Sequence, residues 1–208
     1  ELIPQFDYVK DISEQFGFVN IGVANYEADD VIGTLAKIYS KDNEVHIVTG
    51  DRDILQCINE QVEVWLIRKG FNIYHHYTLN RFNEEYALHP LQLIDIKAFM
   101  GDSADGYPGV KGIGEKTAIK LIQSYGSVEN VLDHIESLTP GQQKKIATDK
   151  ENLILSKQLA EIYTDVPIDT TALYKEMEYT HSLNHILSIC NEHELYVSGK
   201  YLASKILM

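Results

Sequence analysis

The chain has 208 residues, of which 44% are hydrophobic and 24% are charged, with a formal net charge of −13 and two cysteines. This is the composition of an ordinary globular protein with enough apolar residues to bury a core. No apolar run approaches the roughly 20 residues of a membrane span, and the first residues lack the pattern of a signal peptide. Two distant cysteines suit a reducing compartment, so we expect no membrane partner and a cytoplasmic location.

The excess of acidic residues restricts the partner. Phosphate affinity normally comes from lysine and arginine, so a net charge of −13 is unusual for a nucleic-acid binder. Either the partner is not a nucleic acid, or bound cations neutralise many acids while basic residues gather locally. The positions of the acids decide between these alternatives.

The first part of the chain alternates between helix and strand patterns. In chain order we predict a helix over residues 1–16, a strand over 19–23, a helix over 27–40 and a strand over 45–48. Further strands are predicted over 62–67 and 71–77, with a turn at 68–70. This β-α-β order indicates a parallel sheet covered by helices.

From residue 78 the pattern changes to helices separated by prolines. We expect helices over residues 79–87, 91–100, 115–124, 128–137, 140–148, 150–163, 182–193 and 199–206. The predicted fold class is therefore α/β, with residues 1–77 as the C-terminal part of a parallel-sheet core and residues 78–208 as a helical lobe. A sheet of this type rarely begins with a helix, so we expect its first strand or two to lie upstream of residue 1.

Seven carboxylates lie in three short segments: Glu27, Asp29 and Asp30, then Asp51 and Asp53, then Asp102 and Asp105. The first two segments follow predicted strands, at the sheet edge where ligands characteristically bind. Taken singly, acids at a helix start can cap the helix, and acids in loops can simply face solvent. If all seven meet in one cleft, hard cations are the natural compensation, and carboxylate-only ligands favour Mg²⁺ or Mn²⁺. Two such ions suit in-line attack on a phosphodiester.

A glycine-rich segment, residues 108–120, follows the third acidic segment. Its Gly-Ile-Gly turn is expected to expose backbone N–H groups, and these, the next helix start, Lys116 and Thr117 would bind a phosphate. The segment carries local positive charge, and such contacts ignore base identity. The alternative is a plain turn between two helices that needs glycines for packing.

These residues, in this order, resemble the 5′-nuclease superfamily, which includes the 5′→3′ exonuclease domain of bacterial DNA polymerase I and the flap endonucleases. The resemblance rests on YEADDVIGTLA (26–36), TGDRD (49–53) and GDSADGYPGVKGIGEKTA (101–118). It implies a PIN-like nuclease core, a helix-hairpin-helix at about residues 106–125, and a structure-specific 5′-nuclease that uses two metal ions on DNA with a 5′ flap, fork or 5′ end.

By position, the resemblance makes all seven acids metal-site residues, with Asp29, Asp51 and Asp53 as the catalytic ones. The implied DNA-binding residues are Arg52, Lys111, Gly112, Gly114, Lys116 and Thr117. A monovalent cation, usually potassium, is implied at the hairpin, at Val110 and Ile113. The family's upstream aspartates and helical arch have no counterpart in these residues. We therefore expect an incomplete nuclease core that binds branched DNA weakly and cleaves it poorly by itself, and we expect a monomer.

Two other readings remain open. A haloacid-dehalogenase-type magnesium phosphatase also combines D-x-D after a strand with a later GDxxD, and Asp51 would then be a nucleophile. That reading leaves the acids at 27–30 and the hairpin unexplained. The second alternative is a non-catalytic fragment that binds DNA structures.

Overall fold

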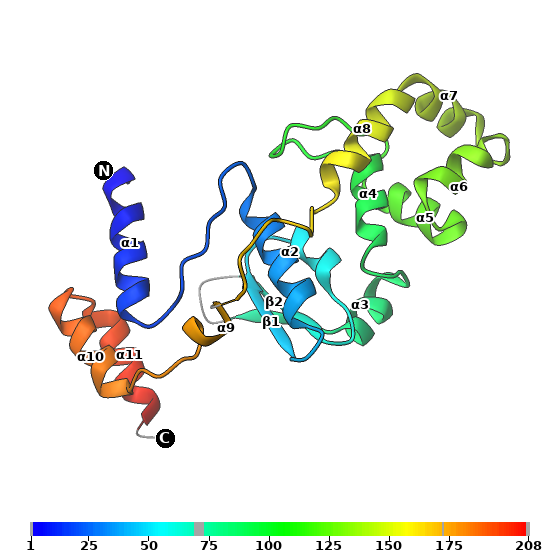
Figure 1. Cartoon of the computed structure of the whole chain (residues 1–208). Coiled ribbons are helices and arrows are strands. Elements are labelled where there is room, and N and C mark those ends of the chain that lie inside the picture. The colour runs from blue at the N-terminus through cyan, green and yellow to red at the C-terminus, as the bar shows by residue number, and fades with distance from the viewer. Residues whose placement is uncertain (1, 69–72, 172, 207–208) are drawn as a thin grey trace. The chain divides into compact units, whose positions relative to one another are not determined.

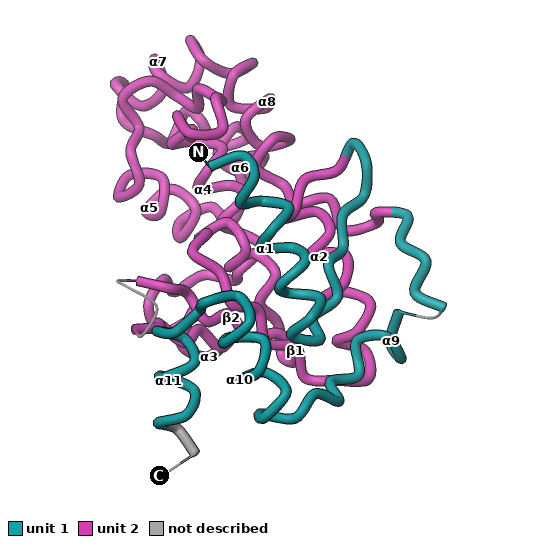
Figure 2. The backbone as a smooth tube through the Cα atoms, turned by 90° about the vertical axis from the view of Figure 1, so that its left-hand side faces the viewer, with its two compact units in different colours: residues 1–25, 167–208 teal, residues 26–166 magenta. Residues whose placement is uncertain are grey.

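The computed structural model describes residues 2–68, 73–171 and 173–206. The chain divides into two compact units, one made of residues 26–166 and the other of both chain ends, residues 1–25 and 167–208 (Figure 2). Each unit has a hydrophobic cluster of its own. None of the helices in the described ranges has the length and apolar character of a membrane span.

A small mixed sheet lies in the larger unit (Figure 1). It consists of β1 (Val45–Thr49), β2 (Val62–Ile67) and β3 (Tyr74–Tyr77), in the order β1-β2-β3. β1 pairs with β2 in parallel and β2 pairs with β3 antiparallel. Residues 62, 64 and 66 of β2 are buried and alternate with more exposed ones, so one face of the sheet packs on the core.

Helices precede, separate and follow these strands. They are α2 (Ala28–Tyr39), η1 (Asp53–Cys57), α3 (Leu79–Tyr86), α4 (Gln92–Met100), α5 (Glu115–Tyr125), α6 (Val128–Asp133), η3 (Ile135–Ser137), α7 (Pro140–Thr148) and α8 (Lys150–Ala160). The sheet and the helices after it share one continuous core, in which Ile54, Phe82 and Phe99 are fully buried. Helix α4 packs against both α5 and α8 and so connects the two ends of the helical segment.

The smaller unit is helical. It contains α1 (Ile3–Gln15), α9 (Leu173–Glu176), α10 (Leu183–Glu192) and α11 (Tyr196–Ile206). Its core is a cluster of Ile186, Ile189 and Cys190, against which Phe16 and Leu202 pack.

Some expected elements differ from the structure. Residues 19–23 form no strand; they are described as coil, and the parallel pair is β1 with β2. The helix expected over 128–137 is divided into α6 and η3, the one over 150–163 ends at Ala160, and α9 was not expected. The start of the strand expected over 71–77 and part of the turn at 68–70 lie outside the described residues. The division into domains at residue 78 stays a prediction, although β3 ends at Tyr77 and only helices are described after it.

Candidate active site

The first acidic segment opens helix α2, and it follows coil rather than the expected strand. Glu27 is the extended residue that precedes the helix, and the Asp30 carboxylate accepts its backbone N–H at 3.2 Å. Asp30 also accepts the backbone N–H of Tyr163 at 2.9 Å, which fastens the chain after α8 to the start of α2. Asp30 therefore has a structural role, of the helix-capping kind considered for this segment.

The second acidic segment follows β1 directly. The Asp51 carboxylate accepts the backbone N–H of Asp53 at 2.9 Å, which forms a tight turn. Asp53 begins η1, and the next two residues, Ile54 and Leu55, are buried, so the core anchors this turn. Because β1 and β2 run in parallel, Asp51 and Asp53 lie at the carboxyl end of the pair, the usual place for a ligand site.

The third acidic segment is a closed loop after α4. Asp102 and Tyr107 exchange two backbone hydrogen bonds of 2.9 and 3.0 Å, and the Asp102 carboxylate accepts the N–H of Ala104 at 2.8 Å. Gly101 and Gly109 have positive φ angles of 69° and 61°, and a Cβ on Gly109 would lie 2.3 Å from the nitrogen of Gly101. The loop can close only with glycine at this crossing.

The three acidic segments meet at one cleft of about 600 Å³. Six of the seven predicted acids line it: Glu27, Asp29, Asp30, Asp51, Asp53 and Asp105. Asp102 is not among the lining residues, but one oxygen each of Asp53, Asp102 and Asp105 lie within 4.8 Å of one another. The acids are thus brought together, whereas their individual roles as metal ligands stay predictions.

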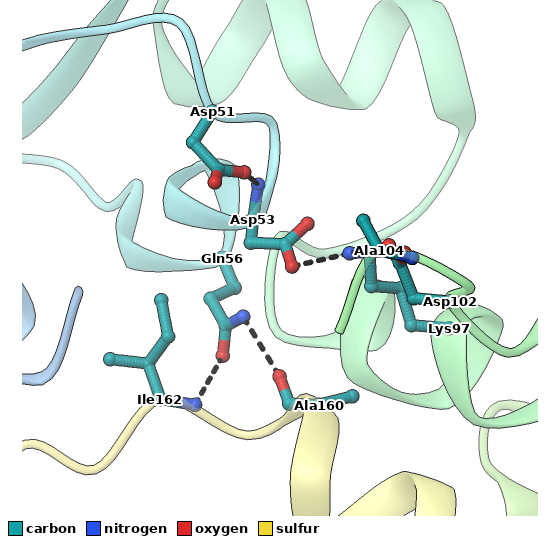
Figure 3. A network of polar contacts seen from close by, with 8 residues as sticks. All are labelled: Asp51, Asp53, Gln56, Lys97, Asp102, Ala104, Ala160 and Ile162. Atoms are coloured by element: carbon teal, nitrogen blue, oxygen red, sulfur yellow. Dashed lines mark hydrogen bonds and ion pairs between the residues drawn. The ribbon is translucent and has the colours of Figure 1, made fainter. Parts of the chain in front are cut away.

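Lys97 of α4 joins two of the three acidic segments. Its ammonium donates to Asp53 and, at 2.8 Å, to Asp102 (Figure 3). Burial opposes the charged form of Lys97, but the hydrogen bonds to Asp102 and Asp53 outweigh it and raise its pKa above the ordinary value. The hydrogen bond from Lys97 also lowers the pKa of Asp102. One internal cation therefore offsets part of the negative charge at this site.

The remaining acids are not neutralised by Lys97. Burial, together with the charges of Asp51, Asp53, Glu27 and Asp30, raises the pKa of Asp29 to about 6. Burial also raises the pKa of Asp53, in spite of its hydrogen bond with Lys97. A folded chain that holds acids with raised pKa values in one cleft favours bound cations. Because the donor set contains only carboxylates, it fits hard divalent ions.

Two residues that were not predicted as site residues, Lys97 and Gln56, also shape the cleft. Gln56 is buried; its amide donates to the carbonyl of Ala160 and accepts the N–H of Ile162, both at 3.1 Å (Figure 3). These bonds hold residues 158–163, which form one wall of the cleft. A signal was present for Lys97, since a lone cation within the apolar helix pattern 91–100 suggests a buried partner of opposite charge.

The predicted hairpin is a turn that leads into α5. It does not connect two helices directly, because α4 ends at Met100 and residues 101–114 lie between α4 and α5. The N–H groups of Lys111 and Ile113 are bonded to the Asp149 carboxylate and the Val110 carbonyl, at 2.9 and 3.0 Å. Among the described residues we find no protein acceptor for the N–H groups of Gly112 and Gly114. Only part of the backbone expected to be exposed is therefore available to a ligand.

The side chains of the hairpin divide into two groups. Lys111 and Lys116 are exposed, whereas Val110 and Ile113 are buried and fix the turn to the core. Gly112 has a φ angle of 80°, and its carbonyl accepts the ammonium of Lys145 at 2.8 Å. The backbone of the turn thus requires glycine, and its surface carries exposed lysines. These features are consistent with both a packing role and a binding role.

Comparisons with known proteins agree with this geometry. Residues 1–87 match the family model of the 5′-3′ exonuclease N-terminal resolvase-like domain, and residues 88–182 match that of the 5′-3′ exonuclease C-terminal SAM fold. A 5′-3′ exonuclease of Bacillus subtilis is 46% identical over 195 residues, which cover 94% of this chain and 65% of that protein. DNA polymerase I of Lactococcus lactis subsp. lactis is 42% identical over 173 residues, 81% of this chain and 20% of that protein.

Solved structures with the same fold include the bacteriophage T5 D15 protein co-crystallised with metal ions. It has a TM-score of 0.65 at 24% identity and covers 88% of this chain and 68% of its own. The catalytic core of Rad2 in complex with a DNA substrate has a TM-score of 0.58 at 18% identity, over 91% of this chain and 64% of that one. These structural similarities show the fold. The sequence matches to 5′-3′ exonucleases argue against the phosphatase alternative. The two consecutive domain models and the Bacillus relative together establish that this chain belongs to the 5′-3′ exonuclease family.

Proposed function

We propose that the chain is a structure-specific 5′-nuclease that hydrolyses phosphodiester bonds of DNA, as a 5′→3′ exonuclease or flap endonuclease. The observation that carries this proposal is the meeting of three acidic segments, far apart in sequence, at one cleft beside the carboxyl end of a parallel strand pair. Membership of the 5′-3′ exonuclease family supports the reaction class. The chain spans 65% of the Bacillus exonuclease and 20% of the polymerase, so the activity of the whole protein is part of the proposal.

The proposed cofactors are two divalent ions, Mg²⁺ or Mn²⁺. Asp53, Asp102 and Asp105 would hold one ion, because their oxygens already lie within 4.8 Å of one another. Asp29 and Asp51, with Glu27, would contribute to the second. Bound there, divalent ions would activate a water for in-line attack and stabilise the charge that develops on the phosphate. Asp30 would act mainly by fixing the cleft wall through its bond to Tyr163.

The chain's own residues would position the substrate. Lys111, Lys116, Thr117 and the N–H groups of Gly112 and Gly114 would bind a duplex phosphate, with a potassium ion at Val110 and Ile113. The proposed substrates are DNAs with a 5′ flap, a fork or a free 5′ end. We further expect the protein to act as a monomer in the cytoplasm.

A 5′-flap cleavage assay tests this function. The chain is incubated with a labelled 5′-flap duplex and with a 3′-flap duplex of the same sequence, in EDTA, Mg²⁺ or Mn²⁺. Weak cleavage of the 5′ flap that requires the metal, with the 3′ flap left intact, is expected. Tight binding of the 5′ flap without cleavage in either metal would instead establish the non-catalytic DNA-binding alternative for this chain.

A further inference from the structure

All three arginines of the chain line one cavity. The sequence contains only Arg52, Arg68 and Arg81, and each of them lines a cavity of about 460 Å³ that also includes Lys116. We call this cavity the arginine groove. Its four cations face two carboxylates, Glu85 and Glu115, and it also contains His75. In a chain with a net charge of −13, this is a marked local reversal of sign.

The fold gathers these cations from separate elements. Arg52 lies in the turn after β1, Arg68 directly follows β2, Arg81 belongs to α3, and Lys116 lies in the first turn of α5. No single segment of the sequence is basic enough to predict such a site. The choice of arginine is informative, since its planar guanidinium matches the geometry of phosphate oxygens better than an ammonium does.

Contacts within the protein hold two of the arginines in place and leave some of their N–H donors free. Arg52 donates to the hydroxyl of Tyr86 at 2.8 Å and lies 3.7 Å from the Glu115 carboxylate. Arg81 donates to the backbone carbonyl of His76 at 3.0 Å, and its guanidinium lies 5.1 Å from the centre of the Tyr77 ring. A guanidinium has five N–H donors, so both retain donors for a ligand.

The third arginine is the most available. The Arg68 side chain is exposed and makes no ion pair or hydrogen bond with any residue in the described ranges. Arg52 lies near Glu115, but among the described residues Arg68 and Arg81 form no ion pair with the acids of the groove. Such an arrangement is expected of a surface that binds an anion.

The groove adjoins the acidic cleft through a single turn. Asp51 and Asp53 line the cleft, and Arg52 between them lines the groove. The groove also includes Lys116, in the first turn of α5. An extended polyanion with one phosphate at the cleft would therefore have neighbouring phosphates over the groove.

We propose that the arginine groove binds the phosphodiester backbone of the DNA substrate next to the cleaved bond. This inference rests on the proposed nuclease function, which it extends by naming a second phosphate-binding surface besides the hairpin. Because the contacts would be with phosphates, they should be independent of base sequence and sensitive to salt.

The test compares two double variants in a binding assay without metal, so that cleavage cannot interfere. Arg68→Gln/Arg81→Gln removes two groove charges, while Arg52 is kept because of its place beside the cleft. Lys41→Gln/Lys175→Gln removes two exposed charges that lie outside the groove. The affinity for a fluorescent 5′-flap duplex is measured by anisotropy at several KCl concentrations and with two base sequences.

We expect the arginine double variant to bind about tenfold more weakly at low salt. The slope of log affinity against log salt should fall by about 2, equally for both sequences, because each lost phosphate contact removes about 0.9. The lysine double variant should stay within about twofold of the wild type. Equal losses in the two double variants, or an unchanged slope in the arginine variant, would overturn the proposal.

A conservative variant guards against a folding defect. Arg68→Lys/Arg81→Lys keeps the charges, so its salt slope should equal that of the wild type while its affinity falls a fewfold from the loss of paired guanidinium bonds. If the glutamine variant does not fold, a wild-type affinity of the lysine variant counts against the proposal. If the arginine double variant loses affinity and salt slope as expected, but the wild-type chain cleaves no DNA with Mn²⁺, the nuclease function is refuted. The proposal that the groove binds DNA would then still stand.

Discussion

The acidic cleft and the hairpin are built in opposite ways. The hairpin lies within residues 110–117, so its glycines and lysines are neighbours in sequence. The cleft draws on residues 27, 29, 30, 51, 53, 104, 105, 107 and 158–163, which only the folded chain brings together. The hairpin's buried residues stabilise it, whereas the acids of the cleft repel one another. The local sequence therefore determines the hairpin, whereas the cleft lowers the stability of the folded chain until cations bind there.

The largest effect should come from removing one carboxylate of the cleft. Asp51→Asn is expected to lower 5′-flap cleavage by about a thousandfold, because metal binding and transition-state charge stabilisation are worth several kcal/mol. DNA affinity in EDTA should be unchanged or slightly higher. Asp133→Asn, an exposed acid at the end of α6, is the matched control and should cleave normally. An active Asp51→Asn enzyme would remove this residue from the site.

Two lysines allow the cleft to be compared with an ordinary ion-pair site. Lys97 bridges Asp53 and Asp102, and Lys157 bridges Asp95 and Glu129 outside the cleft. Lys97→Met and Lys157→Met should each lower the free energy of unfolding by about 2 kcal/mol, since each leaves two acids without their cation. Urea unfolding with Mn²⁺ should recover stability for Lys97→Met but not for Lys157→Met. Recovery in both, or in neither, would contradict a cation site at Asp53 and Asp102.

The pH dependence of stability should expose the repulsion among the acids. The folded pKa of Asp29 is raised to about 6 from an ordinary value of 3.8, so the folded chain holds this proton more tightly than the unfolded chain. Asp29 therefore destabilises the fold progressively as pH rises from about 4 to 6, and fully above that range. In EDTA, Asp29→Asn should be more stable than the wild type by about 1 kcal/mol at pH 7, after allowance for solvent screening, and no more stable at pH 4. The measurement is thermal unfolding of both proteins at pH 4 and pH 7. An Asp29→Asn variant that is less stable than the wild type at pH 7 would show that Asp29 is favourably paired instead.

The smallest effect concerns the hairpin. Lys116→Ala should weaken binding of duplex DNA and reduce its salt slope by about 1, as expected for one lost phosphate contact. Because the side chain is exposed, stability should not change. Lys41→Ala serves as the matched control in the same anisotropy titration. A salt slope that is identical in the two variants would place DNA elsewhere than at the hairpin.

Much of the fold follows from local pattern. The strands at 45–49 and 62–67 and the helices of the 79–160 region were predicted with small errors at their ends, because their apolar periodicity agrees with their burial. Residues 19–23 were predicted wrongly, although Val19, Ile21 and Val23 alternate like a strand. They have no pairing partner among the described residues, and alternation alone cannot supply one.

The candidate site was predictable to the extent that it depends on motifs. The acids and glycines could be named from sequence, since their spacing carries the resemblance to the nuclease family. The sequence could suggest that Lys97 has a buried partner, but it could not identify the partners of Lys97, the bonds of Gln56 or the arginine groove, because each depends on contacts between distant segments. The helix after Lys150 ends at Ala160, earlier than expected, where Gln56 and Asp30 hold the following residues as a wall of the cleft.

We propose that the acids of three segments form one cleft that binds divalent ions. The most direct test is a crystal of this chain grown in Mn²⁺, with the ions located by anomalous diffraction. We expect manganese on the oxygens of Asp53, Asp102 and Asp105, and a second ion near Asp29 and Asp51. A crystal with millimolar Mn²⁺ and no ion at any of these acids would contradict the claim.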